Sequence, residues 1–303
     1  MSNVPLPFTV ESDLELGRRI APYLVERGGD VVIRQGEVPE SLEGEGAEGG
    51  AYQIRKNRVL IKVPEGPRYL IEDGRSIRYA YTAGNSDKEV ALFLLGSAWG
   101  ALCYQRGLIP LHASAIAIDG QVHAFTGYSG AGKSTLAAAL AARGREFFTD
   151  DVLILDPAQL DPEPLCFTGQ KDLKLWQDAI KLTGAERGAP VRSAEDFEKY
   201  YATPRHQSSA VSGRLANLFI LAEEKNRQGP EIEAVTGAHT VTKLVSSVYR
   251  PAFADAILGR RALYEGLKKL VGRVRLHRFR RRFDADHFAS GVDFLDDWID
   301  AHG

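Results

Sequence analysis

Cysteine, methionine and long apolar runs are all scarce in this sequence. Among its 303 residues there are two cysteines and one methionine, and no window approaches the roughly 18 apolar residues of a membrane-spanning helix. Cys103 and Cys166 lie in apolar surroundings without the spacing of a metal site, which argues against a disulfide scaffold or a cysteine-ligated metal. The N-terminus also lacks a basic region followed by an apolar run. We therefore expect two reduced core cysteines in a cytoplasmic protein that does not enter a membrane.

Net charge is nearly absent too. The 38 basic and 40 acidic residues leave a formal charge of −2, whereas a general nucleic-acid binder relies on excess positive charge. The one basic cluster places six arginines within residues 273–282. Because they partly alternate with apolar residues, and aspartates follow, this cluster predicts an edge strand with a charged outer face. The sequence therefore argues against nucleic-acid binding.

Length and composition indicate two domains. Hydrophobic residues make up 44% of the chain and charged residues 26%, as in ordinary globular proteins. Alternating apolar residues at 58–63, 69–71 and 77–81, separated by turn formers, predict antiparallel hairpins. Residues 14–26 predict a helix, residues 43–50 a loop, and residues 87–106 a buried helix joining the domains. We expect a mainly β domain over residues 1–106, with either a recognition or assembly role or a packing role, and a second domain over residues 107–303.

The most informative stretch is residues 121–135. A short apolar strand leads into a glycine-rich loop, and an alanine-rich segment typical of a helix follows. Glycines let the backbone N–H groups turn inward, and the start of the helix adds the positive end of its dipole, so the pattern predicts a phosphate-binding loop. Lys133 would meet the β- and γ-phosphates and the Ser134 hydroxyl would ligate Mg²⁺. The residues expected to bind the nucleotide are Gly127, Ser129, Gly130, Ala131, Gly132, Lys133, Ser134 and Thr135.

An acidic pair follows 17 residues after Lys133. Asp150 and Asp151 come at the end of an apolar segment, where phosphate-loop enzymes commonly place a carboxylate that holds Mg²⁺. Two adjacent carboxylates allow one to be neutralised by metal while the other accepts a proton. His112 begins the strand before the loop, so it is either a hydrogen-bonded rim residue or a neighbour of the γ-phosphate and metal.

These motifs together resemble the catalytic domain of HPr kinase/phosphorylase, whose phosphate-loop architecture is shared with phosphoenolpyruvate carboxykinase. The matching segments are Leu-His-Ala-Ser at 111–114, the glycine loop, Ala-Arg-Gly at 142–144 and Thr-Asp-Asp at 149–151. A Leu-Trp pair at 175–176 is similar to HPr-kinase-like proteins found beside biosynthetic clusters for ribosomally made peptides, including lasso-peptide kinases. The resemblance covers about residues 109–157. The downstream Leu-Glu-x-Arg-Gly-Leu-Gly segment of HPr kinases is absent, and residues 170–176 stand in its place.

The resemblance implies a role for each residue of the site. Asp150 would be the general base toward a serine hydroxyl, and Asp151 and Ser134 would organise Mg²⁺. His112 and Lys133 would lie at the phosphate. The implied fold is an α/β phosphate-loop kinase domain of the HPr kinase and phosphoenolpyruvate carboxykinase type, preceded by a small, mainly antiparallel β domain, and the resemblance also implies a homo-oligomer.

The remaining C-terminal half has fewer signals. Residues 183–212 are polar and predict a long loop, typical of a lid or a substrate-binding segment. Lys174, Arg205 and Arg214 are better interpreted as solvated surface than as phosphate ligands. A strand is predicted at 215–222, with helices at 241–249, 253–271 and 292–299.

The sequence thus favours an enzyme. We expect a kinase that uses ATP, or a related phosphoryl donor, with Mg²⁺ to phosphorylate a serine of a peptide or protein, such as a lasso-peptide-type precursor. Two alternatives stay open: phosphorylation of a small molecule, and a nucleotide-sensing regulatory module without phosphoryl transfer. Acceptor-dependent ADP release separates the enzymes from the sensor.

Overall fold

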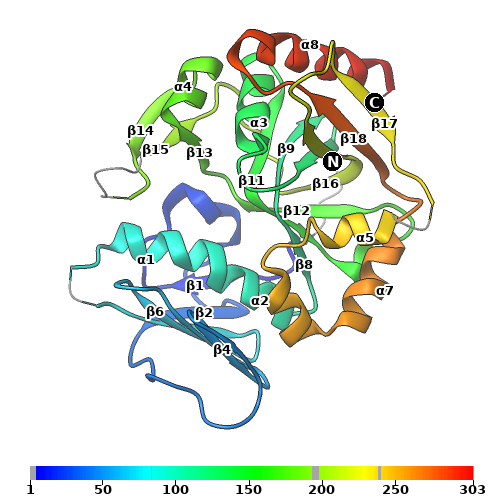
Figure 1. Cartoon of the computed structure of the whole chain (residues 1–303). Helices are drawn as coiled ribbons and strands as arrows, with labels where there is room; N and C mark the ends of the chain where they lie inside the picture. The colour runs from blue at the N-terminus through cyan, green and yellow to red at the C-terminus, as the bar shows by residue number, and fades with distance from the viewer. Residues whose placement is uncertain (1–4, 83, 193–197, 238–239, 303) are drawn as a thin grey trace.

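The computed structural model of this chain describes residues 5–82, 84–192, 198–237 and 240–302. The fold is mixed α/β, with two large sheets and a small three-stranded one (Figure 1). A continuous helical segment, residues 87–105, lies between the two large sheets. This arrangement leaves the glycine loop facing the N-terminal part of the chain.

The first sheet has seven strands in the order β1-β2-β7-β6-β5-β4-β3. The predicted hairpins are confirmed, since the pairs from β7 to β3 are all antiparallel, while β1–β2 and β2–β7 are parallel. Two local predictions were wrong: residues 47–49 of the expected loop form a strand, and the expected helix is only a 3₁₀ segment, Gly17–Tyr23, with a proline inside it. The strands are β1 (Val10–Ser12), β2 (Val31–Gln35), β3 (Ala47–Gly49), β4 (Tyr52–Arg55), β5 (Arg58–Lys62), β6 (Arg68–Glu72) and β7 (Ser76–Ala80).

The buried helix predicted after this sheet is confirmed. It consists of α1 (Asp87–Phe93), a π-helical turn at Leu94–Ala98 and α2 (Trp99–Gln105). Ser86 and Glu89 start it with a reciprocal capping box. Trp99 is 1% exposed and packs against the rings of Phe8 and Tyr23 at 5.1 and 5.4 Å. One hydrophobic cluster runs from the first sheet through this helix into the second, and the division into domains at residue 106 stays a prediction.

The second sheet curls back on itself. Strand β10 pairs with β9 on one side and with β16 on the other, and the pairings β9–β11, β11–β12 and β12–β16 complete a closed circuit. Helix α3 (Lys133–Ala142) packs against this sheet and α8 (Ala285–His302) packs against α3. The strands are β8 (Ile109–Leu111), β9 (Ala113–Ile118), β10 (Gln121–Thr126), β11 (Glu146–Leu155), β12 (Leu165–Gln170), β16 (Ser212–Glu223), β17 (Glu231–Ala234) and β18 (Arg275–Arg281).

The C-terminal half departs most from the sequence predictions. The expected long loop at 183–212 contains β14 (Glu186–Pro190) and β15 (Lys199–Thr203), which join β13 (Leu173–Trp176) in the third sheet; its residues 193–197 lie outside the described ranges. The helix predicted at 253–271 is interrupted at Gly259. The remaining helices are α4 (Gln177–Thr183), α5 (Thr240–Val245), α6 (Pro251–Phe253), a π turn at Ala254–Leu258 and α7 (Arg260–Leu270).

The arginine-rich strand is not at an edge. Strand β18 lies between β16, to which it is parallel, and the short β17. Arg280 forms ion pairs with Glu224, Glu231 and Glu233 at 3.2, 3.3 and 2.8 Å. Part of the positive charge of this cluster is therefore neutralised by nearby carboxylates.

Two compositional expectations can be compared with the structure. Cys103 and Cys166 are both free and buried, as predicted, and burial raises the pKa of each thiol well above its ordinary value. Over the described ranges, none of the helices combines the length and the apolar character needed to cross a bilayer.

A buried polar chain links three strands of the second sheet. Asn217 lies between His123 and His277, with its amide 3.0 Å from Nδ1 of His123 and 3.1 Å from Nε2 of His277. The histidines are 1% and 7% exposed, and burial, followed by the charge of Arg275, lowers the pKa of each to about 4. Both are therefore neutral in the folded protein at neutral pH.

The two buried histidines of this hydrogen-bonded chain predict that the folded protein loses stability in acid. Since the folded pKa values lie below the unfolded value of about 6.5, the unfolded chain binds more protons, and stability is full above pH 6.5 and lost toward pH 4. Each histidine contributes a slope of at most about 1.4 kcal/mol per pH unit. Urea unfolding midpoints measured from pH 7 to 4.5 should fall, and less steeply in the His123→Gln/His277→Gln double variant than in wild type. The exposed His206→Gln control should keep the wild-type slope, and a double variant with that same slope would contradict the assignment.

Candidate active site

The glycine loop connects the end of β10 to the start of α3, as the sequence predicts. Gly130 and Gly132 have φ angles of 91° and 81°, a left-handed conformation that glycine adopts without strain. Gly132 is the residue before the first turn of α3, so the unpaired N–H groups of that turn face the loop. Local backbone geometry therefore forms a concave site for an anion.

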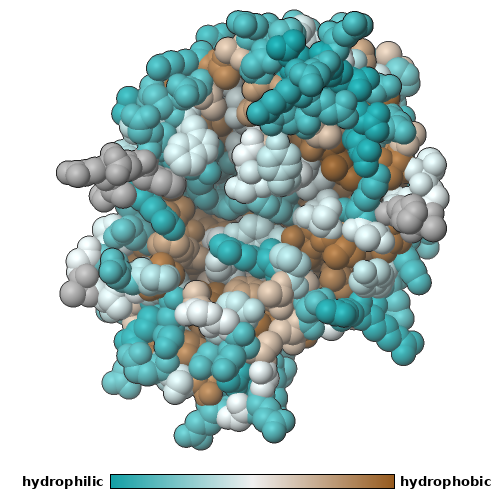
Figure 2. Space-filling view, in the orientation of Figure 1, coloured by the Kyte–Doolittle hydropathy of each residue, from teal (hydrophilic) through white to brown (hydrophobic). Residues whose placement is uncertain are grey.

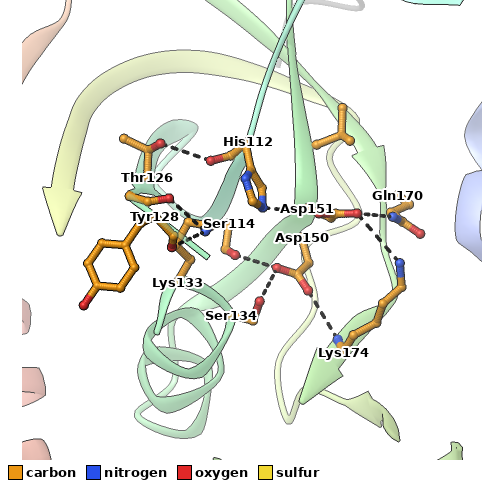
Figure 3. Close-up of polar contacts among 12 residues, drawn as sticks. His112, Ser114, Thr126, Tyr128, Lys133, Ser134, Asp150, Asp151, Gln170 and Lys174 are labelled. Carbon is orange, nitrogen blue, oxygen red and sulfur yellow. Dashed lines mark hydrogen bonds and ion pairs between the residues drawn. The ribbon is translucent and has the colours of Figure 1, made fainter. Parts of the chain in front are cut away.

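Lys133 lies inside this loop. Its ammonium donates to the carbonyls of Gly127 and Tyr128 at 3.1 and 3.2 Å (Figure 3). The residue is 7% exposed, and burial lowers the pKa of Lys133, opposed by the charges of Asp150 and Asp151. The loop thus encloses the ammonium group of Lys133.

Asp150 is the most completely hydrogen-bonded carboxylate of the site. It is 2% exposed and accepts hydrogen bonds from the hydroxyl of Ser114 and, at 2.8 Å, from that of Ser134. Its other oxygen accepts from the backbone N–H of Lys174 at 3.3 Å. The hydroxyl of Ser134, at the start of α3, therefore lies next to the carboxylate of Asp150 on β11 (Figure 3).

Asp151 reaches the same site because β11 is irregular there. The register against β12 shifts between residues 150 and 153, and Asp151 has a φ of 68°. Adjacent residues of a regular strand point to opposite faces, whereas a bulge redirects a side chain. The Asp151 carboxylate lies 3.5 Å from Nε2 of His112, 3.5 Å from Gln170 and 3.9 Å from the ammonium of Lys174. The acidic pair thus lies within one strand rather than at its end.

His112 is held by its backbone and its ring. Its N–H donates to the carbonyl of Ser247 at 2.7 Å, and its ring meets that of Tyr249 edge-on at 5.8 Å. Burial lowers the pKa of His112, with a further contribution from the charge of Lys133, and this outweighs the opposite effect of Asp151. The imidazole beside Asp151 is therefore neutral at neutral pH.

Lys174 corrects an expectation. It is 8% exposed and faces Asp151, so it is not the solvated surface residue that the sequence suggested, whereas Arg205 and Arg214 are exposed as expected. Sequence reasoning also missed Ser114 and Gln170. Both are polar residues within otherwise apolar strands, which was the available signal.

The donor set suits a hard cation. Within the described ranges no group of three or more His, Cys, Asp or Glu side chains could hold a metal ion. Mg²⁺ does not require such a group, because it usually takes one or two carboxylates and completes its shell with phosphate oxygens and water. The oxygens of Ser134, Asp150 and Asp151 fit that requirement.

A cleft of about 1240 Å³ opens over the loop. Its walls include Phe93 and Ser97 of the segment between the sheets, and Figure 2 shows this face hollowed there. A smaller, largely apolar cavity of about 400 Å³ adjoins the cleft, since Phe93, Ser97, Arg250 and Pro251 line both. Cations outnumber anions along the cleft: Lys133, Lys174, Lys181, Arg192, Lys199 and Arg250 against Asp150, Asp151 and Asp178.

Comparison with known proteins yields a distant structural likeness. No family model matches the chain, and no curated protein matches its sequence. Among solved structures, the chain is similar to the Hpr(Ser) kinase/phosphatase from Coxiella burnetii, with a TM-score of 0.34 and 13% sequence identity over 64% of this chain and 89% of that one.

Proposed function

We propose that this protein is a Mg²⁺-dependent kinase that transfers the γ-phosphoryl group of ATP, or of a related donor, to a serine hydroxyl. The observation that carries the proposal is the meeting of Lys133 and Ser134 with the Asp150–Asp151 pair in one basic cleft. A glycine loop alone would bind an anion, but two carboxylates beside it also provide for a metal and for a proton.

The loop would bind the phosphates. Backbone N–H groups of residues 127–135 and the ammonium of Lys133 would neutralise charge on the donor and on the transferring group. Ser134 and one carboxylate of the acidic pair would hold Mg²⁺, which when bound would neutralise charge on the phosphate oxygens.

The contacts support a division of labour between the two carboxylates. Asp150 is buried, accepts three hydrogen bonds and touches Ser134, so we assign it to the metal side. Asp151 has a side chain that is 29% exposed and only long contacts, so its oxygens are better able to accept a proton from an acceptor hydroxyl. This assignment reverses the one drawn from the sequence resemblance.

The size and the charge of the cleft favour a peptide or protein as the acceptor. Its volume exceeds the roughly 300 to 1,000 Å³ of a typical small-molecule site, and it continues into the apolar cavity beneath Arg250 and Pro251. The basic lining favours an acceptor segment with negative charge. We propose a serine-containing peptide, such as a lasso-peptide-type precursor, which residues 1–106 would help to recognise.

Mass spectrometry of candidate acceptors tests the proposal. After incubation with ATP and Mg²⁺, wild-type protein should add one phosphate to a serine and release ADP in step. Lys133→Ala should lower this rate at least about 100-fold, since it removes the cation that stabilises the transferring group. Lys268→Ala, on the exposed face of α7, is the matched control and should retain full activity. ADP release that no peptide stimulates would point to a small-molecule acceptor or to a sensor.

A further inference from the structure

Arg281 lies buried behind the glycine loop. It is the last residue of β18, is 3% exposed, and its guanidinium carbon sits 5.2 and 5.1 Å from the ring centres of Phe279 and Phe283. One terminal nitrogen donates to the carbonyl of Ala131 at 3.1 Å. Its Nε is buried and has no hydrogen-bond partner among the described residues.

This guanidinium forms no ion pair with the described residues, although the charge of Glu223, its register partner on β16, acts on it. No carboxylate in the described part of the chain lies within ion-pair distance, although its neighbours Arg280 and Arg282 both have such partners. Burial lowers the pKa of Arg281 to about 10, so the group is still charged at neutral pH. A buried charge without an ion-pair partner lowers stability, and an anion bound nearby would offset that cost.

The glycine loop is thin at this point. A Cβ placed on Gly132 would lie 3.1 Å from a terminal nitrogen of Arg281 and 2.4 Å from two carbons of the Phe283 ring. Gly132 itself lines the cleft on its other side. The guanidinium is therefore separated from the cleft by little more than one peptide unit.

The orientation of that peptide unit links the two sides. In a trans peptide the carbonyl of Ala131 and the N–H of Gly132 point in opposite directions. Because Arg281 holds the carbonyl at the back of the loop, the N–H of Gly132 is directed toward the cleft. The contact thus fixes a donor where the proposed function requires one.

We propose that Arg281 is a positioning residue for a polyphosphate: it orients the Ala131–Gly132 peptide and supplies a buried positive charge that the bound anion compensates. The proposal rests on the proposed function only in taking the glycine loop as a phosphate site. On this proposal Arg281 strengthens binding of the anion but does not stabilise the protein when the anion is absent. A purely structural arginine would stabilise the protein in both states.

Calorimetric titration with pyrophosphate and with Mg²⁺–ADP, combined with thermal unfolding, tests this. Arg281→Met keeps the apolar stem but removes the charge, and should weaken binding at least about tenfold while the unfolding temperature without ligand stays equal or rises. Arg281→Lys restores charge without the planar fork and should recover part of the affinity. Arg280→Met, the neighbouring control, should leave affinity unchanged.

The outcomes separate the two proposals. If wild-type protein binds neither pyrophosphate nor Mg²⁺–ADP, the proposed function itself fails. If wild type binds and Arg281→Met binds equally well, only the role of Arg281 is overturned. A Met variant that loses affinity and stability together would show a structural role and would also overturn it.

Discussion

Asp150→Asn is expected to lower the rate of serine phosphorylation on the order of 1,000-fold while nucleotide binding is retained. The amide has the same shape and can still accept from Ser134, but it removes the negative charge that Asp150 holds beside that hydroxyl. Measured with ATP and an acceptor peptide, the variant should need much more Mg²⁺ to reach its residual rate. Its pH profile should keep the wild-type form.

The partner variant separates the roles of the two carboxylates. Asp151→Asn should also lose most activity, but its rate should no longer rise as a carboxylate ionises, and its Mg²⁺ requirement should stay close to that of wild type. Asp178→Asn, at the exposed rim of the same cleft, should behave as wild type. If instead Asp150→Asn alters the pH profile and Asp151→Asn the metal requirement, the roles drawn from the sequence resemblance are correct.

Trp99→Ala should have the largest effect on stability, lowering the free energy of unfolding by about 3–5 kcal/mol. Trp99 is 1% exposed and packs against Phe8 and Tyr23, so the substitution leaves a cavity where the N-terminal segment meets the helix between the sheets. Urea unfolding followed by circular dichroism measures the change. Tyr264→Ala, on an exposed aromatic of α7, should change stability by no more than about 0.5 kcal/mol.

The same experiment examines the domain division. Because one hydrophobic cluster spans both large sheets, wild-type protein should unfold in a single transition, and Trp99→Ala should shift that transition as a whole. Two separate transitions, with only the first moved by the substitution, would favour independent domains at 1–106 and 107–303. A loss below about 1 kcal/mol would contradict the importance of this contact.

The sequence located the centre of the site because its signals are local. Glycines 130 and 132, Lys133 and Ser134 follow one strand and begin one helix, so composition and spacing suffice to recognise them. Asp150 and Asp151 were found by their position after the loop. Both side chains reach the cleft because β11 has a bulge there, and no residue pattern in the sequence predicts that bulge.

Long-range contacts account for what was missed. Ser114, Gln170 and Lys174 come from other strands and meet the acidic pair only through the pairing of the curled sheet and its continuation into β13. Strand β14 is exposed along its whole length, so it lacks the apolar alternation by which strands are recognised. The polar composition of residues 183–212 therefore predicted a loop where two strands pair.

The N-terminal segment also contacts the end of β12 and the turn that follows it. Tyr23 donates to the carbonyl of Thr168 at 2.6 Å, and the backbone carbonyl of Arg19 accepts from the N–H of Lys171 at 2.9 Å. The guanidinium of Arg19 also pairs with Asp172 at 2.7 Å. These contacts hold the turn at residues 171–172, which connects Gln170 at the end of β12 to β13 and its Lys174. A recombination that exchanged the first hundred residues for those of another protein would remove these contacts and release this turn, so the two parts of the gene are not interchangeable modules.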